Sequence, residues 1–134
     1  MIDGGNATLF VSDMDRSVDF YTNVLGLELR FRAENHWAEV VAGKDLVLGI
    51  HPASANAAPP GTVGAIQIGL NVTVPLEEVR RELAEHGLDF SGEIKEDEGV
   101  GRLARMADPD GNCLYFWEPA DYKSSSEQVE AAGA

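Results

Sequence analysis

Two aromatic side chains near the end of the chain could recognise a small molecule by stacking and hydrogen bonding. Tyr115 and Trp117 alternate along the apolar run 113–117, which follows the turn sequence of residues 108–111. An apolar, aromatic run after such a turn is typical of a buried strand. Residues two apart in a strand share a face, so both rings point to the same side. Tyr115 is also a candidate acid or base.

The same alternation selects further candidates in three other predicted strands, 7–11, 46–50 and 66–72. In each of them one face is apolar and is expected to pack under a helix. The residues left on the opposite faces are Asn6, Thr8, Phe10, Val47, Gly49, His51, Gln67, Gly69 and Asn71. A face that mixes small, polar and aromatic residues is solvated, forms an interface or lines a cavity. The large aromatics expected beside Gln67 and Asn71 make plain solvation the weakest of these alternatives.

The elements that would position these residues occur twice along the chain. A helix follows each of the strands 7–11 and 66–72, with apolar residues at helical spacing over 14–25 and again over 76–83. Ser12 or Asp13 can cap the first helix and Thr73 the second. A chance match of a common α+β pattern is the alternative to a true repeat.

Three further strands are predicted in each half, at 27–33, 37–41 and 46–50 and again at 90–94, 102–107 and 113–117. We therefore predict an α+β fold of two βαβββ modules. They occupy about residues 6–51 and 65–119, with a linker over 52–64. Together they form a single domain, residues 1–119. Residues 120–134 are expected to form a flexible C-terminal tail.

Two stretches carry a resemblance to a known family. LFVSDMDRSVDFYTNVLGLEL (9–29) and MADPDGNCLYFWEP (106–119) resemble the vicinal oxygen chelate superfamily. Its members include glyoxalase I, extradiol dioxygenases, fosfomycin-resistance enzymes and bleomycin-resistance proteins. The resemblance implies that the two modules lie side by side and form a curved mixed sheet around a cavity. It also implies a homodimer.

The resemblance further implies where a metal would bind, in the first and last strands of each module. These places fall on Asn6, Gly49, Gln67 and Tyr115 in this chain. Only Gln67 is a plausible ligand, whereas a divalent transition metal normally takes several His or carboxylate donors. We therefore expect no cofactor, and keep a divalent metal as the less favoured alternative, with His51 as a substitute ligand.

Three other residues have uncertain or competing roles. Pairing across the 108–111 turn is expected to place Arg102 on the Tyr115 face, where it could bind an anionic ligand. The favoured alternative is a salt bridge from Arg102 to the acidic segment 92–99. The face of Trp37 cannot be assigned, because the register of the turn after Val41 is uncertain. Cys113 has no evident base beside it and is expected to be a packing residue.

Composition narrows the class of partner. The formal net charge is −13, with 10 basic and 23 acidic residues among 134, so nucleic acid is an unsuitable partner. Such a field attracts a cationic ligand, although a soluble acidic surface is the simpler explanation. No apolar run is long enough to span a membrane, and the N-terminus lacks the pattern of a signal peptide. With one cysteine and no such signal, we expect a cytoplasmic protein.

The leading functional hypothesis is a metal-free binding protein of the bleomycin-resistance type, which holds a small cationic or aromatic molecule. The expected ligand-binding residues are Asn6, Phe10, His51, Gln67, Asn71, Arg102, Tyr115 and Trp117. The main alternative is a lyase, isomerase or dioxygenase-type enzyme. It would depend on a metal or use His51 and Tyr115 as acid and base. A noncatalytic partner or sensor module is the third hypothesis.

Overall fold

The computed structural model describes residues 1–90 and 92–120, which form two compact units. The first unit contains residues 1–67 together with 107–113, and the second contains 68–106 and the chain from Leu114 onward. The turn 108–111 of the second predicted module is therefore part of the first unit. Apart from Ala120, the predicted tail at 120–134 lies outside the described residues.

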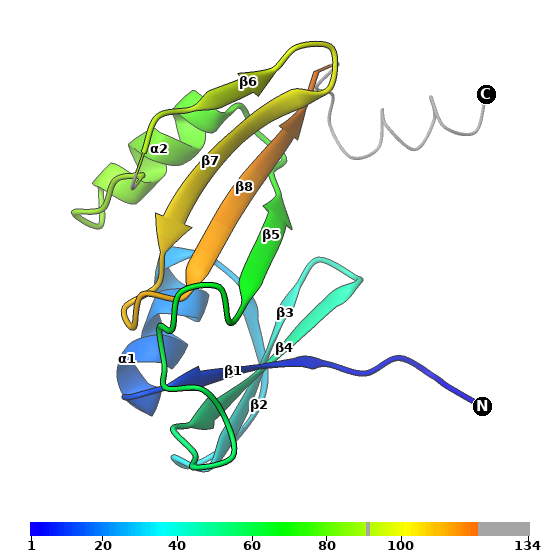
Figure 1. Ribbon diagram of the computed structural model, residues 1–134, viewed down its shortest axis with the longest axis vertical. Coiled ribbons are helices and arrows are strands. Elements are labelled where there is room, and N and C mark those ends of the chain that lie inside the picture. Colours follow the sequence, from blue (N-terminus) through cyan, green and yellow to red (C-terminus); the bar gives the residue numbers. More distant parts are fainter. Residues whose placement is uncertain (91, 121–134) are drawn as a thin grey trace. The chain divides into compact units, whose positions relative to one another are not determined.

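The first unit holds a four-stranded mixed sheet with the order β1-β4-β3-β2 (Figure 1). Its strands are β1 (Ala7–Val11), β2 (Glu28–Ala33), β3 (Trp37–Ala42) and β4 (Leu46–Pro52). Strand β1 pairs parallel with β4, and the other neighbours pair antiparallel. This is the βαβββ pattern that the sequence predicts.

The core of the first unit follows from the alternation along β1 and β4. Leu9, Val11, Leu48 and Ile50 are at most 1% exposed and lie on the helix side of the sheet. The α-helix α1 (Met14–Asp19) packs on β4 through this side. The predicted facing of both strands is thus confirmed, and the opposite face carries no helix of this unit.

The first helix is shorter than predicted, because its second half widens into a π-helix. Asp13 is the N-cap, and its carboxylate accepts the amide N–H of Arg16 at 3.0 Å. Beyond α1, the segment η1 (Phe20–Val24) closes with a five-residue hydrogen bond from Leu25 N–H to the Phe20 carbonyl. The Thr22 hydroxyl donates a hydrogen bond to the Val18 carbonyl at 2.6 Å. This side-chain bond competes with the helical bond to the same carbonyl and so favours the wider turn.

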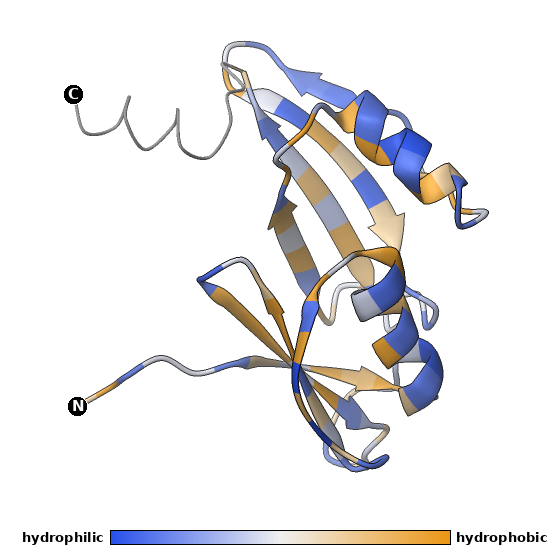
Figure 2. Ribbon diagram, turned by 180° about the vertical axis from the view of Figure 1, so that it is seen from behind, coloured by the Kyte–Doolittle hydropathy of each residue, from blue (hydrophilic) through white to orange (hydrophobic). Residues whose placement is uncertain are grey.

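The second unit holds the other four-stranded sheet, in the order β5-β8-β7-β6, with α2 (Leu76–Ala84) on one face (Figure 1). Its strands are β5 (Gln67–Asn71), β6 (Lys95–Asp97), β7 (Gly101–Ala107) and β8 (Cys113–Pro119). Hydrophobic and hydrophilic residues alternate as bands along these strands (Figure 2). Leu114 and Phe116 are buried as predicted, whereas Tyr115 and Trp117 are only partly buried.

The predicted strand at 90–94 is wrong, because β6 begins only at Lys95. Phe90 is buried for a different reason. Its ring lies 5.8 Å from that of Phe116 and beneath the Arg80 guanidinium, 4.6 Å from ring centroid to Cζ. The Asp89 carboxylate accepts the Phe90 amide N–H at 2.7 Å, so this N–H is engaged locally and not by a neighbouring strand. The apolar character of Phe90 therefore reflects packing in the core, and it does not indicate a strand.

The start of α2 is capped from a distant strand. Pro75 is the N-cap residue and cannot cap with a side chain, so the predicted cap at Thr73 is wrong. Instead, the Glu118 carboxylate of β8 accepts the Leu76 amide N–H at 2.8 Å. A carboxylate satisfies an otherwise orphan helix N–H and complements the helix dipole there.

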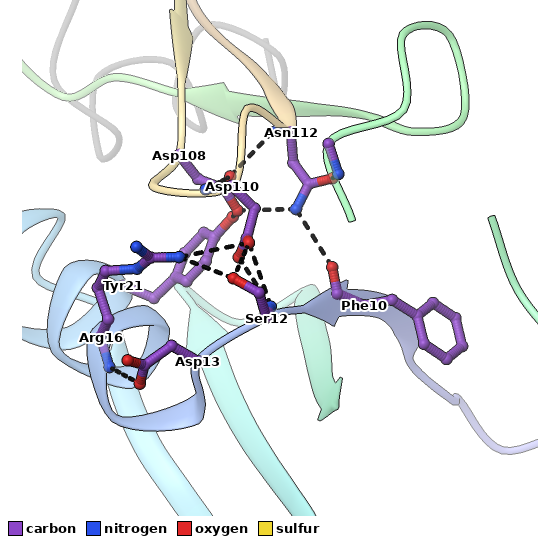
Figure 3. A network of polar contacts seen from close by, with 9 residues as sticks. Phe10, Ser12, Asp13, Arg16, Tyr21, Asp108, Asp110 and Asn112 are labelled. Carbon is purple, nitrogen blue, oxygen red and sulfur yellow. Dashed lines mark hydrogen bonds and ion pairs between the residues drawn. The ribbon is translucent and has the colours of Figure 1, made fainter. Parts of the chain in front are cut away.

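The turn that joins β7 to β8 is held by the Asp108 carboxylate. This carboxylate accepts the amide N–H groups of Asp110 and Asn112 and the buried hydroxyl of Tyr21 (Figure 3). The Asn112 amide in turn accepts the Gly61 N–H at 3.0 Å. The turn predicted at 108–111 is confirmed, and it closes one residue later, with Asp108 N–H donating to the Asn112 carbonyl.

None of the helices in the described part of the chain is long and apolar enough to cross a bilayer.

We expect the ionisation of Glu77, in the first turn of α2, to make the free energy of unfolding depend on pH in the acidic range. Hydrogen bonds from the Arg102 guanidinium lower the Glu77 pKa from 4.5 to about 2. A lowered pKa in the folded state stabilises above the unfolded value, and the effect is lost as pH falls from 4.5 towards 2. Glu77 is 59% exposed, so solvent screening keeps the effect small.

Urea unfolding of the natural protein and Glu77→Gln at several pH values measures this effect. The natural protein should be the more stable near pH 6, and the difference should shrink by pH 2. A difference that is constant over this range would mean that the ionisation of Glu77 makes no contribution to stability.

Candidate functional site

The uncovered face of the second sheet contains a hollow of about 390 Å³. It is lined by Gly69 and Asn71 of β5, Leu103 of β7, and Tyr115 and Trp117 of β8. A volume of this size falls in the range of small-molecule pockets. The lining is aromatic and polar with no charged side chain, and it offers the Asn71 amide, the Tyr115 hydroxyl and the Trp117 indole N–H.

Both aromatic rings of this hollow lie against glycines of neighbouring strands, which we call glycine seats. A Cβ atom built on Gly69 would lie 2.4 Å from the Tyr115 hydroxyl oxygen and from Cζ of its ring. A Cβ atom on Gly101 would lie 2.7 Å from Cζ2 of Trp117. Since real Cβ atoms do not approach so closely, each ring lies against backbone that only glycine provides. The two rings therefore have fixed orientations before any ligand arrives.

The first sheet carries a second aromatic cluster on its uncovered face. The Phe10 ring lies 5.3 Å from His51 and the Trp37 ring 6.3 Å from His51, between ring centroids. Trp37 lies over Gly49, where an added Cβ atom would come within 2.1 Å of its Cη2 atom. The register Glu39↔Gly49 between β3 and β4 makes this a diagonal cross-strand pair. Trp37 therefore belongs to the His51 face.

Hydrogen bonds orient the polar atoms of this cluster. The Trp37 indole N–H donates to Glu39 Oε2 at 2.9 Å, and Arg30 donates to Oε1 of the same carboxylate. These bonds, with that from Trp37 the strongest influence, lower the pKa of Glu39 and keep it ionised. His51 Nδ1 lies 2.6 Å from the Pro52 carbonyl oxygen. A carbonyl only accepts, so Nδ1 carries the proton in this contact and Nε2 is left as the acceptor in neutral His51.

The structure gathers the predicted site residues into two groups. Phe10 and His51 lie together in the first unit, and Asn71, Tyr115 and Trp117 lie together in the second. Asn6 and Gln67 are exposed, and the Asn6 side chain accepts the Thr8 hydroxyl at 3.3 Å. Sequence reasoning left out Glu39 and could not place Trp37. The alternation of Trp37, Glu39 and Val41 indicates that these residues share a face. Which face it is depends on the register of the turn at 43–45, which the sequence does not show.

The predicted face of Arg102 is wrong. Its guanidinium binds Glu118 and Glu77, with nitrogen–oxygen distances from 2.6 to 2.9 Å, and so lies on the α2 side of the sheet. The favoured salt bridge to segment 92–99 is replaced by these two partners. The cause is the turn, which pairs Asp108 with Asn112 and shifts the register by one residue, so that Leu103 lies beside Trp117 instead.

The residues at the four implied metal positions do not fit a divalent metal. Gly49 has no donor atom and is covered by the Trp37 indole, and the Tyr115 ring lies against Gly69. Glu118, the carboxylate of the last strand, is on the opposite face and is occupied by Arg102 and the Leu76 amide. Across the described residues, no three His, Cys, Asp or Glu side chains are grouped so that they could hold a metal ion.

A family model, the Glyoxalase/Bleomycin resistance protein/Dioxygenase superfamily, matches residues 5–116. No sequence among curated proteins matches significantly.

Several solved structures share the fold. One is TnmS3, an antibiotic binding protein from Streptomyces sp. CB03234, with 25% identity, a TM-score of 0.73, and coverage of 90% of this chain and 98% of that one. Another is a superfamily member from Sphaerobacter thermophilus, with 27% identity, a TM-score of 0.70, and coverage of 88% and 98%. A lactoylglutathione lyase from Agrobacterium tumefaciens, 19% identical with a TM-score of 0.68 and coverage of 88% and 96%, is similar in fold alone.

Proposed function

Because the chain belongs to the glyoxalase/bleomycin resistance protein/dioxygenase superfamily, we propose that it binds a small planar or cationic molecule without a metal. The observation that carries the proposal is the hollow of about 390 Å³ on the second sheet. Its glycine-seated rings offer rigid stacking surfaces, and Asn71, Tyr115 and Trp117 offer hydrogen bonds. Rigid rings favour binding because little conformational freedom is lost when the ligand arrives.

Two further observations support a binding protein. TnmS3, which is described as an antibiotic binding protein, is similar to this chain over nearly the whole length of both. The net charge of −13 would raise the local concentration of a cationic ligand. The homodimer and the cytoplasmic location stay predictions from the sequence.

The absence of a metal is proposed from the chemistry of the donor positions. Gly49 has no side chain to hold the ion, and the Tyr115 ring lies against Gly69. A site of this kind offers too few His or carboxylate donors for a divalent transition metal. Measuring metal content after incubation with Fe, Mn, Ni, Zn and Co salts and desalting tests this part. A stoichiometric metal would overturn it.

Calorimetric titration with cationic glycopeptide antibiotics and planar aromatic antibiotics, in the presence of EDTA, tests ligand binding. We expect at least one compound to bind well below millimolar concentration. If no compound binds at millimolar concentration, or if binding requires an added metal, the proposal is wrong.

We expect Gly69→Ala to weaken binding of that compound about tenfold, since overpacking costs of order 1–3 kcal/mol. The new methyl group would collide with the Tyr115 ring and displace it from its position against the backbone. Gly92→Ala is the matched control, because its methyl group meets nothing within 4 Å. Thermal unfolding of both variants should show intact folds. Equal affinity in the two variants would place the ligand elsewhere.

One observation favours an enzyme as the second candidate function. The contact between His51 Nδ1 and the Pro52 carbonyl leaves His51 Nε2 as a proton acceptor on the uncovered face of the first sheet. A lyase or isomerase could use it as a base, and Tyr115 of the second unit is the other predicted acid–base candidate. Mass spectrometry of the ligand after prolonged incubation separates the two functions. A binding protein returns the ligand unchanged, whereas turnover lost in His51→Ala or Tyr115→Phe would identify an enzyme.

A further inference from the structure

Building on the proposed binding function, we propose that Glu39 and Gly49 are positioning residues for the Trp37 indole. They hold it against the first sheet as a surface that selects a planar organic cation. This surface lies in the first unit alone, and its tryptophan is not the one that lines the 390 Å³ hollow.

Gly49 fixes the depth of the indole. A Cβ atom at this position would lie 2.1 Å from Cη2, 2.6 Å from Cζ2 and 2.9 Å from Cζ3 of Trp37. All three atoms belong to the six-membered ring, so this ring rests directly on the Gly49 backbone. Any larger residue would push the ring away from the sheet and tilt it.

Glu39 fixes the rotation of the indole about that seat. Its Oε2 atom accepts the indole N–H at 2.9 Å, while Arg30 holds Oε1 with Nε at 3.0 Å. Arg30 thus fixes one oxygen of the carboxylate, and the other oxygen fixes the indole N–H. Together with the Gly49 contact, this bond constrains the indole at both of its ends.

These contacts also decide what the indole offers to a ligand. Its only N–H is engaged by Glu39, so the ring presents its π face and no donor. Donation to a carboxylate increases the electron density of the ring, which strengthens attraction to a cation over its face. Phe10 and His51 add two further rings beside it. With a net charge of −13, the protein as a whole also disfavours an anionic ligand.

Two probes of matched shape test the preference for a cation. The cation 1-methylquinolinium and neutral quinoline, at pH 8, are titrated into 15N-labelled full-length protein. The two indole N–H signals are assigned with Trp37→Phe and Trp117→Phe. We expect the Trp37 signal to respond, with the cation binding about threefold to fivefold more tightly than quinoline.

Variants then separate the two positioning residues. Glu39→Gln should move the Trp37 N–H signal upfield without ligand, and reduce the preference for the cation to less than about twofold. Glu98→Gln removes one exposed charge from the second unit and should change neither. Gly49→Ala should weaken both probes about tenfold. Its ligand-free spectrum reports whether the fold is kept.

Equal affinity for the two probes, or no response of the Trp37 signal, would overturn this inference. An unmoved Trp37 signal in ligand-free Glu39→Gln would overturn the role of Glu39 even if both probes bound. A response of Trp117 alone would support the proposed binding function and reject the Trp37 surface. Failure of the antibiotic panel while the cation still binds at Trp37 would reject the proposed function and keep this inference.

Discussion

Asp108→Ala is expected to destabilise the first unit by about 4 kcal/mol, near the upper end for a single substitution. The Asp108 side chain is buried, with 5% of the residue exposed, and its two oxygens accept four hydrogen bonds. These come from the Tyr21 hydroxyl at 2.7 Å, two amide N–H groups of the turn, and the Asn112 side chain (Figure 3). Removing the carboxylate leaves the buried Tyr21 hydroxyl and the Asn112 amide N–H without their acceptor, whereas the Asn112 side chain keeps a longer contact with the Phe10 carbonyl at 3.5 Å.

The size of the effect comes mainly from Tyr21. This residue is fully buried, and its burial, together with Asp108, raises its pKa far above 10, so that the hydroxyl keeps its proton and donates. An orphaned buried hydroxyl costs about 1–3 kcal/mol on its own. The lost bonds to the turn amides add to this cost, because the turn closes around the same carboxylate.

Urea unfolding of three variants checks this expectation. Tyr21→Phe should cost only about 1.5 kcal/mol, since the carboxylate keeps its three N–H donors. The double variant should be less destabilised than the sum of the single variants, because both changes remove the same bond. A loss below about 1 kcal/mol in Asp108→Ala would mean that water satisfies the network after substitution.

The sequence predicted those parts of the fold that depend on local pattern. The period of two in β1, β4 and β8 identified which side chains face the helices, and burial of Leu9, Leu48 and Leu114 confirms it. Gly26 and Gly87 follow the two helical segments, and their φ angles of 77° and 74° favour glycine there.

Features that depend on register between strands could not be predicted in the same way. The face of Arg102 depended on whether Asn112 pairs with Asp108 or with Ala107, because a shift of one residue reverses the face of every side chain in the strand. The face of Trp37 required the turn at 43–45, which the structure closes with Ala42 opposite Leu46. The local sequence pattern gives almost no information about the register between strands.

Long-range partners formed the other gap. The N-terminus of α2 takes its cap from Glu118, 42 residues away, so a search near Thr73 could not find it. The glycine seats were visible only as small residues on an uncovered face. Their role depends on which ring of a neighbouring strand lies over each of them, and that again is a matter of register.

Glu118→Ala is expected to destabilise the second unit by about 3 kcal/mol. The Glu118 carboxylate is buried, with 8% of the residue exposed, and joins β8 to both α2 and β7. It accepts the Leu76 amide N–H at 2.8 Å and two Arg102 nitrogens at 2.9 and 2.8 Å. Its loss removes the cap of α2 and leaves the Arg102 guanidinium with Glu77 alone.

Two terms add up to this magnitude. A lost N-terminal cap costs about 1 kcal/mol, and α2 has no replacement because Pro75 has no polar side chain. Breaking one side of a buried ion pair costs about 3–5 kcal/mol. Arg102 is 26% exposed and keeps its two bonds to Glu77, so the ion-pair term falls below that range, to about 2 kcal/mol. Glu118→Gln keeps one accepting oxygen and should lose about half as much.

Hydrogen exchange localises the effect as well as measuring it. In Glu118→Ala the amide of Leu76 and the rest of the first turn of α2 should exchange faster than in the natural protein, beyond the change caused by lower global stability. Glu77→Gln is the matched control, since it removes the exposed partner of Arg102 and leaves the Leu76 bond in place. If both variants expose the first turn equally, Arg102 rather than Glu118 holds α2 against the sheet.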